Sequence, residues 1–248
     1  MKRFFQILTL LSLLASTGQA QTRTVQYRPY TDLRQLHFGI LVGMHLQDIG
    51  LKNVGPQPVE FDDGTMEEKT IVCEDDRWNA GFSVGVLADL RLSKHFNLRF
   101  TPTMHFGSKH LTFHNLTDVD KQGRPTEVTQ DMKNTYLSLP LDLKFSAERW
   151  NNYRPYLMAG INPMLNLSGR DNDYLKLKGM DTFLEVGVGC DFYLPFFKLR
   201  PELKFMFGLT NCLDTKHASQ LRDKNMLMYT NSVSDAHSRM IALTFYFE

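Results

Sequence analysis

The chain has 248 residues, of which 42% are hydrophobic and 22% are charged, and its 28 basic residues nearly balance its 27 acidic ones. Affinity for nucleic acid depends on a surplus of Lys and Arg, so this balance excludes a nucleic-acid partner as the main function. The 18 Phe and 9 Tyr residues supply ample material for burial and exclude a disordered chain.

The amino end has the order of a secretory signal peptide. Lys2 and Arg3 precede an apolar run over 4–15, and small residues at positions 18 and 20 favour cleavage after Ala20. An anchor helix is disfavoured, because a spanning helix needs about 18 to 20 apolar residues. We therefore expect a cleaved signal peptide at 1–20, a short periplasmic segment at 21–35, and one exported domain at 36–248.

After this segment the dominant pattern is alternation with period two. Phe38, Ile40 and Val42, for example, share one face of a strand, while Gly39 and Gly43 lie on the other. The same pattern recurs along the chain and predicts eight strands: 37–47, 81–92, 97–106, 136–145, 154–165, 183–192, 199–208 and 241–247. Most of these have the length of a tilted transmembrane strand, about 9 to 11 residues.

Long polar connections alternate strictly with short ones. In chain order they are 48–79 (long), 93–95 (short), 108–133 (long), 147–152 (short), 167–181 (long), 195–196 (short) and 209–237 (long). This asymmetry, together with an even strand number, is typical of an up-and-down transmembrane barrel with short periplasmic turns and long external loops. The predicted fold is therefore all-β, an eight-stranded antiparallel transmembrane β-barrel with four long external loops.

The polar faces of the predicted strands carry five acids and five bases. They are Asp89, Arg91, Arg99, Asp142, Lys144, Glu185, Asp191, Arg200, Glu202 and Lys204. Unpaired charges are costly to bury, so a balanced set is what a buried face requires. We expect these residues to form a structural charge network in the lumen while the apolar face contacts lipid. Alternation by itself does not say which face is inside, so a soluble periplasmic ligand-binding barrel remains an alternative.

Five prolines fall within the predicted strands, at positions 102, 140, 155, 163 and 201. Proline removes a donor from the hydrogen-bond ladder. These positions are expected to be bulges, breaks or strand ends, and Pro163 is expected to mark where the fifth strand stops pairing.

The three cysteines are too few for a disulfide scaffold and lack the spacing of a zinc site. Cys73 and Cys212 fall in the first and last long loops, which become neighbours when the last strand closes on the first. They are therefore the one candidate disulfide. Cys190 is expected to lie on the lipid face as a free thiol.

Nothing in the pattern favours catalysis, a metal or a cofactor. His105, His110 and His114 straddle a strand end and a loop, without a spacing that places three ligands on one face. The Ser, His and acidic residues around His217 and His237 lack the strained elbow that presents a nucleophilic Ser. A non-enzymatic protein is predicted, and a hydrolase sited on the outer rim is the enzymatic alternative.

Three segments resemble PorT-type outer-membrane proteins. They are Tyr-Leu-Ser-Leu-Pro-Leu-Asp-Leu-Lys-Phe at 136–145, Arg-Pro-Tyr-Leu-Met-Ala-Gly at 154–160, and above all Cys-Asp-Phe-Tyr-Leu-Pro-Phe-Phe-Lys-Leu-Arg-Pro-Glu-Leu-Lys-Phe-Met-Phe-Gly-Leu at 190–209. That family is associated with the type IX secretion system of Gram-negative bacteria. The resemblance implies an accessory component in the export or maturation of secreted proteases and surface proteins. A general outer-membrane barrel for adhesion or envelope integrity is the rival interpretation.

The resemblance also implies partners. They are the outer-membrane bilayer, other secretion-system proteins reached through the loops or through 21–35, and the barrel-insertion machinery. Phe245 and Phe247 lie on the apolar face of an aromatic-rich last strand, the usual insertion signal, although Glu248 follows them.

Overall fold

The structure is a computed structural model that describes residues 25–60, 64–75, 77–119, 121, 123–168, 173–221 and 224–248. The expected signal peptide at 1–20 lies outside these residues. The described part contains twelve strands: β1 (Leu36–Asn53), β2 (Gly55–Glu60), β3 (Met66–Asp75), β4 (Asn79–Arg91), β5 (Phe96–Phe100), β6 (Thr103–Val119), β7 (Pro125–Ser138), β8 (Leu141–Ser146), β9 (Tyr153–Asn166), β10 (Met180–Tyr193), β11 (Lys198–Gly208) and β12 (Val233–Phe247).

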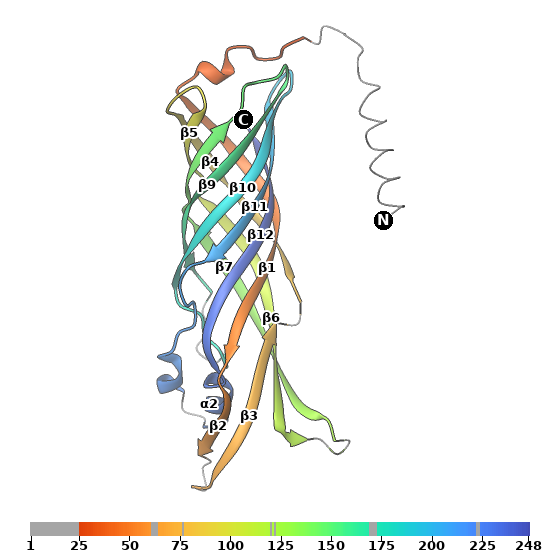
Figure 1. Cartoon of the computed structure of the whole chain (residues 1–248), viewed down its shortest axis with the longest axis vertical. Helices are drawn as coiled ribbons and strands as arrows, with labels where there is room; N and C mark the ends of the chain where they lie inside the picture. Colours follow the sequence, from red (N-terminus) through yellow and green to blue (C-terminus); the bar gives the residue numbers. More distant parts are fainter. Residues whose placement is uncertain are drawn as a thin grey trace, which may run out of the picture.

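All twelve strands belong to one antiparallel sheet, which closes on itself because β12 pairs with both β11 and β1. β5 and β6 lie one after the other and together fill one strand position of the ring, which we call a stave. β7 and β8 together fill another. Counted in this way, the ring has eight staves, and β2 and β3 form an additional hairpin beyond one end (Figure 1). The expected eight uninterrupted strands are thus corrected to twelve segments around an eight-stave ring.

Prolines explain the two breaks. Pro102 separates β5 from β6, and Pro140 separates β7 from β8, as the loss of a ladder donor predicts. Pro163 does not end pairing, because β9 continues to Asn166 and Pro163 opposes Thr182 of β10. The Pro163 carbonyl accepts a hydrogen bond from the Leu139 amide. Its missing donor therefore faces the break between β7 and β8, where no regular ladder bond is lost.

The apolar rows face outward and the polar rows face inward. Phe38, Val86 and Leu157 are 67%, 54% and 57% exposed, whereas Asp89 and Arg99 are completely buried. The sheet thus has an apolar outer surface, which we call the outer wall, and a charged interior. This is the arrangement expected of a barrel that contacts lipid. None of the described helices has both the length and the apolar character required to span a bilayer.

The two ends of the barrel differ (Figure 1). Tight turns and the C-terminus lie at one end, which we call the periplasmic end. At the other end β2, β3 and the outer parts of β6 and β7 continue past the ring, together with the short helices η2 (His217–Gln220) and α2 (Lys224–Thr230). We call this outer assembly, with residues 167–168, 173–179, 209–221 and 224–232 of the connections, the head. Segments 48–79 and 108–133, expected to be polar loops, are therefore largely β-strand.

An apolar core holds the head together and covers the outer mouth of the barrel. It draws on all four long connections and comprises Ile49, Ile71, Cys73, Leu111, Phe113, Met132, Leu175, Leu177, Cys212, Leu213, Tyr229, Val233 and Ala236. The rings of Phe113, Tyr174 and Tyr229 pack edge to face, with centroids 5.1–5.7 Å apart. This packing closes the lumen on the outer side with apolar side chains.

Cys73 and Cys212 lie buried in this same core, but no disulfide joins them in the structure, and Cys190 is not disulfide-bonded either. The Cys212 thiol donates to the carbonyl oxygen of Ala236, 3.1 Å away. The candidate pair is therefore brought into one cluster without a bond between the two sulfur atoms.

A charge placed on the outer wall tests the orientation of the sheet. Val186→Arg, at the middle of β10, is expected to lower the free energy of unfolding by about 2–4 kcal/mol in phospholipid vesicles, because Arg at mid-bilayer depth is poorly solvated. Met66→Arg, which lies in the head and is 74% exposed, is the matched control and should change little. Equal stability of the two variants would contradict a lipid-facing wall.

Candidate functional site: a charge-filled lumen with two closures

The lumen is filled by charged side chains from five of the eight staves. Six acids and six bases are buried along it: Asp89, Asp142, Asp181, Glu185, Asp191, Glu202, Arg99, Lys109, Lys144, Lys198, Arg200 and Lys204. Nine of the ten residues expected from the sequence are in this set. Arg91 is the exception, because it lies at the periplasmic rim and its guanidinium reaches only the Leu33 carbonyl.

Arg99 and Glu202 form the centre of the network. Arg99 Nη1 lies 2.5 Å from Glu202 Oε2, and both side chains are fully buried. The hydroxyls of Tyr156 and Tyr246 also donate to the Glu202 carboxylate, at 2.7 and 2.8 Å. The Arg99 guanidinium lies 5.1 Å from the centre of each of these two rings. Two aromatic rings and one carboxylate thus hold a buried cation in place.

On the outer side of this centre, Lys204 of β11 joins three carboxylates. Its Nζ lies 2.9 Å from Glu185 and 3.7 Å from both Asp142 and Glu202. Asn162 donates a further hydrogen bond to Glu185. Gly160 faces Asp142, and a Cβ there would collide with the carboxylate, so this narrow lumen needs glycine at that point.

On the periplasmic side, Arg200 and Lys144 converge on aspartates. Arg200 Nη1 lies 2.8 Å from Asp89, and its Nε lies 3.1 Å from Asp191. Lys144 Nζ lies 2.9 Å from Asp191. Each of these four buried charges therefore has an opposite charge on another stave, which is the condition for burying it.

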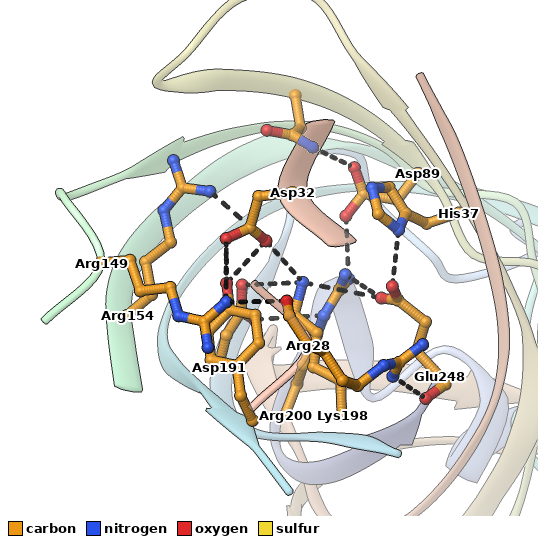
Figure 2. Close-up of polar contacts among 12 residues, drawn as sticks. Arg28, Asp32, His37, Asp89, Arg149, Arg154, Asp191, Lys198, Arg200 and Glu248 are labelled. Carbon is orange, nitrogen blue, oxygen red and sulfur yellow. Dashed lines mark hydrogen bonds and ion pairs between the residues drawn. The ribbon is translucent and has the colours of Figure 1, made fainter. Parts of the chain in front are cut away.

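Asp32, in the turn η1 (Thr31–Leu33), closes the periplasmic end (Figure 2). Its carboxylate accepts a hydrogen bond from the Tyr193 hydroxyl at 2.7 Å. Lys198 lies 3.6 Å away, and Arg149 and Arg154 each lie 3.9 Å away. The segment 25–35 is thereby folded across the barrel mouth. We call this segment, with the turn 147–152, the cap.

The last residue completes the closure. Glu248 follows β12, and its carboxylate pairs with Arg200 and, at 2.5 Å, with Nδ1 of His37. Burial raises the pKa of Glu248, but the charge of Arg200, the hydrogen bond with His37 and the charge of Lys198 together lower that pKa to about 2. The carboxylate therefore remains ionised at neutral pH and ties the end of the chain to the lumen.

Sequence patterns could not identify the cap. Asp32 and Arg149 lie in or next to turns, where no period-two pattern assigns a direction to a side chain. Arg154 begins the predicted strand 154–165 and shares its buried row with Tyr156. Lys198 begins β11 and could have been assigned to the polar row by extending the predicted strand one residue. The length assigned to this strand was the only sequence feature that could have placed Lys198 in the lumen.

The described residues considered for catalysis and metal binding form separate pairs: His237 Nε2, for example, lies 3.3 Å from Asp235. The Ser234 hydroxyl donates to the Lys52 carbonyl and not to an imidazole. His217 lies against the Asp173 carbonyl, and His110 pairs with Asp131. Among the described residues no three His, Cys, Asp or Glu side chains are grouped as metal ligands.

Comparison with known proteins agrees with this geometry. A family model described as the outer membrane protein beta-barrel domain matches residues 19–214. The chain belongs to this family. It is an outer-membrane β-barrel of the kind found in Gram-negative bacteria, embedded in the lipid bilayer. No curated protein matches the chain by sequence.

Solved structures with a similar outline include three outer-membrane proteins. Neisserial surface protein A is 12% identical, with 86% of this chain and 98% of that chain covered and a TM-score of 0.42. OprG from Pseudomonas aeruginosa is 11% identical, with 85% and 95% covered and a TM-score of 0.47. Ail, the attachment invasion locus protein of Yersinia pestis, is 12% identical, with 86% and 99% covered and a TM-score of 0.36.

In this outer-membrane barrel the central ion pair can be tested with a double-mutant cycle. Arg99→Met is expected to lower the free energy of unfolding by about 3–5 kcal/mol, because it leaves the buried Glu202 carboxylate without its cation. Arg99→Met with Glu202→Gln should recover most of that loss. Urea unfolding in lipid vesicles measures both, and a double variant less stable than the single one would contradict a coupled pair.

The cap can be tested by neutralising its central carboxylate. Asp32→Asn should speed amide hydrogen exchange in 25–35 and in the turn 147–152, because three cations lose their common counter-charge, while exchange in β10 and β11 stays slow. Glu148→Gln is the matched control at the same end, since the pair of Glu148 with Lys94 is exposed and contributes little. Unchanged exchange in Asp32→Asn would show that the cap is held by other contacts.

Proposed function

We propose that this outer-membrane barrel is a non-conducting accessory component of type IX protein secretion. One observation carries the proposal: the lumen is filled mainly by paired charges and covered at both ends, by the cap and by the head's apolar core. A ring of eight staves is only wide enough for its own side chains. Such a barrel acts through surfaces outside the membrane and not as a conduit.

The secretion role rests on the resemblance of residues 190–209 to PorT-type proteins. In the structure these residues form the end of β10, the turn and all of β11. They supply Asp191, Lys198, Arg200, Glu202 and Lys204 to the lumen and Phe196 to the periplasmic turn. The stretch that carries the resemblance is thus the one that builds the closed lumen.

The cap is the surface best suited to a periplasmic partner. Tyr30 and Leu33 flank and end η1, and they are 76% and 62% exposed although both are apolar. Asp32 between them is held inward by the cations of the mouth. The cap therefore presents two fixed apolar side chains to the periplasm, a common feature of protein interaction surfaces.

Deletion of the gene tests the proposal directly. Export of folded secreted proteases should be lost and should return with the wild-type gene or with the lumen double variant Arg99→Met, Glu202→Gln. A Tyr30→Ser, Leu33→Ser variant should fold and reach the outer membrane but restore export poorly. Normal export in the deletion strain would exclude a role in secretion, and a defect limited to adhesion or envelope integrity would favour a general surface barrel.

A further inference from the structure

The sheet of the head has two free edges, and they differ. Beyond the ring the strands follow the order β7-β6-β3-β2, so β2 and β7 are the outermost strands. β2 carries Pro56 and Pro58, which lack amide hydrogens. Thr70 opposes Pro56 but donates its amide to the Thr117 hydroxyl, away from β2, so Pro56 and, by alternation, Pro58 face outward. The edge of β2 is therefore protected against pairing with another strand.

β7 begins with Pro125 but has no proline from Thr126 to Ser138. β7 pairs with β9 only through Tyr136, Leu137 and Ser138, and it pairs with β6 without a register shift from Ser138 to Thr126. Thr135 bonds away from β6, because its amide donates to Ser168 and its carbonyl accepts from Leu167. The amide and carbonyl groups of successive residues point to opposite sides of a strand. Those of residues 127, 129, 131 and 133 therefore point away from β6, as those of Thr135 do.

We call these four positions the β7 edge: Glu127, Thr129, Asp131 and Lys133. All four are exposed, and within the described parts of the chain no backbone partner is found for them on the side away from β6. The acids are held in place from β6, since His110 Nδ1 lies 2.5 Å from Asp131 and His114 Nδ1 lies 3.3 Å from Glu127. The β7 edge is thus an ordered row of donors and acceptors that is open to another strand.

The order of side chains along the β7 edge is self-complementary in one direction only. When two β7 strands lie antiparallel about Gln130, Glu127 of each copy opposes Lys133 of the other, and Thr129 opposes Asp131. Every opposed pair of this kind exchanges two backbone hydrogen bonds. In a parallel, in-register arrangement Glu127, Asp131 and Lys133 would each face the same charge, which is destabilising.

We propose that the β7 edge is a self-recognition site through which two copies of this chain pair β7 with β7, antiparallel. All copies in one membrane point their heads the same way, so the β7 strands of two neighbouring copies run in the same direction. This is the parallel arrangement, in which like charges face each other. Antiparallel pairing requires copies that face each other. The natural partner is therefore a second copy in an apposed outer membrane, and the contact is a cell-to-cell or vesicle-to-vesicle adhesion. This inference is independent of the role proposed in secretion.

Self-association of the full chain in detergent micelles tests the backbone contact, because micelles leave the relative orientation free. The wild type should show a concentration-dependent dimer in sedimentation velocity. Thr129→Pro removes an outward-facing donor from each copy and keeps the bonds to β6, so it should weaken the dimer by about tenfold or more. Thr129→Ala keeps the donor and should dimerise like the wild type. A monomeric wild type, or equal dimerisation of the Pro and Ala variants, would overturn the proposal.

Charge exchange tests the register. Glu127→Lys and Lys133→Glu should each weaken the dimer, since each places like charges opposite each other, and the double variant should restore it because opposite charges face each other again. Vesicles that contain the protein should cluster with the same ranking, measured by light scattering. Failure of the double variant to recover, or dimers in detergent without clustering of vesicles, would overturn the antiparallel contact between membranes.

Discussion

The structure depends on one constraint: a sheet that lies in lipid must satisfy all of its backbone groups, and it does so only by closing. Closure occurs where β12 pairs with β1 over fourteen residue pairs, from Ile40 opposite Phe247 to Asn53 opposite Val233. Phe245 and Phe247 lie on the outer wall of this closing strand. Their role as an insertion signal stays a prediction.

Closure with eight staves decides what the lumen can be. The interior admits side chains but no wide channel, and residues that face inward are removed from water whether they are apolar or charged. Charges in such a place need an opposite charge or polar hydrogen-bond partners, which explains why Arg99 meets Glu202 and two tyrosines, and why Arg200 is shared among Asp89, Asp191 and Glu248. The network rigidifies the barrel and leaves the cap and the head as the surfaces on which function rests.

Much of this fold could be read from the sequence because alternation has a physical cause. Residues such as Phe38 and Asp89 must face opposite sides of a strand, so the staves and nine of the twelve buried lumen charges followed from the pattern. The head did not follow. Ile71, Phe113 and Leu175 are scattered through segments that are polar on average, and their common core forms only when four distant connections meet. The cap was likewise hidden, because Asp32 lies in a turn.

The prolines within the strands also show what could not be predicted from the sequence alone. Breaks at Pro102 and Pro140 were expected from the missing donor, whereas the end of pairing expected at Pro163 was wrong. A missing amide hydrogen ends strand pairing only where the neighbouring strand has a carbonyl group that would have accepted its hydrogen bond. Beside Pro163 the neighbour is itself broken, so β9 continues.

The most direct test of the account is a spin-label scan along β4 in lipid vesicles, on a background with the native cysteines replaced by Ser. Labels at Phe82, Val84 and Val86 should be accessible to oxygen dissolved in the bilayer, and labels at Ser83 and Asp89 should be shielded from it. A scan in which the even positions are shielded and the odd positions are accessible would mean that the apolar rows face inward, and would contradict the account.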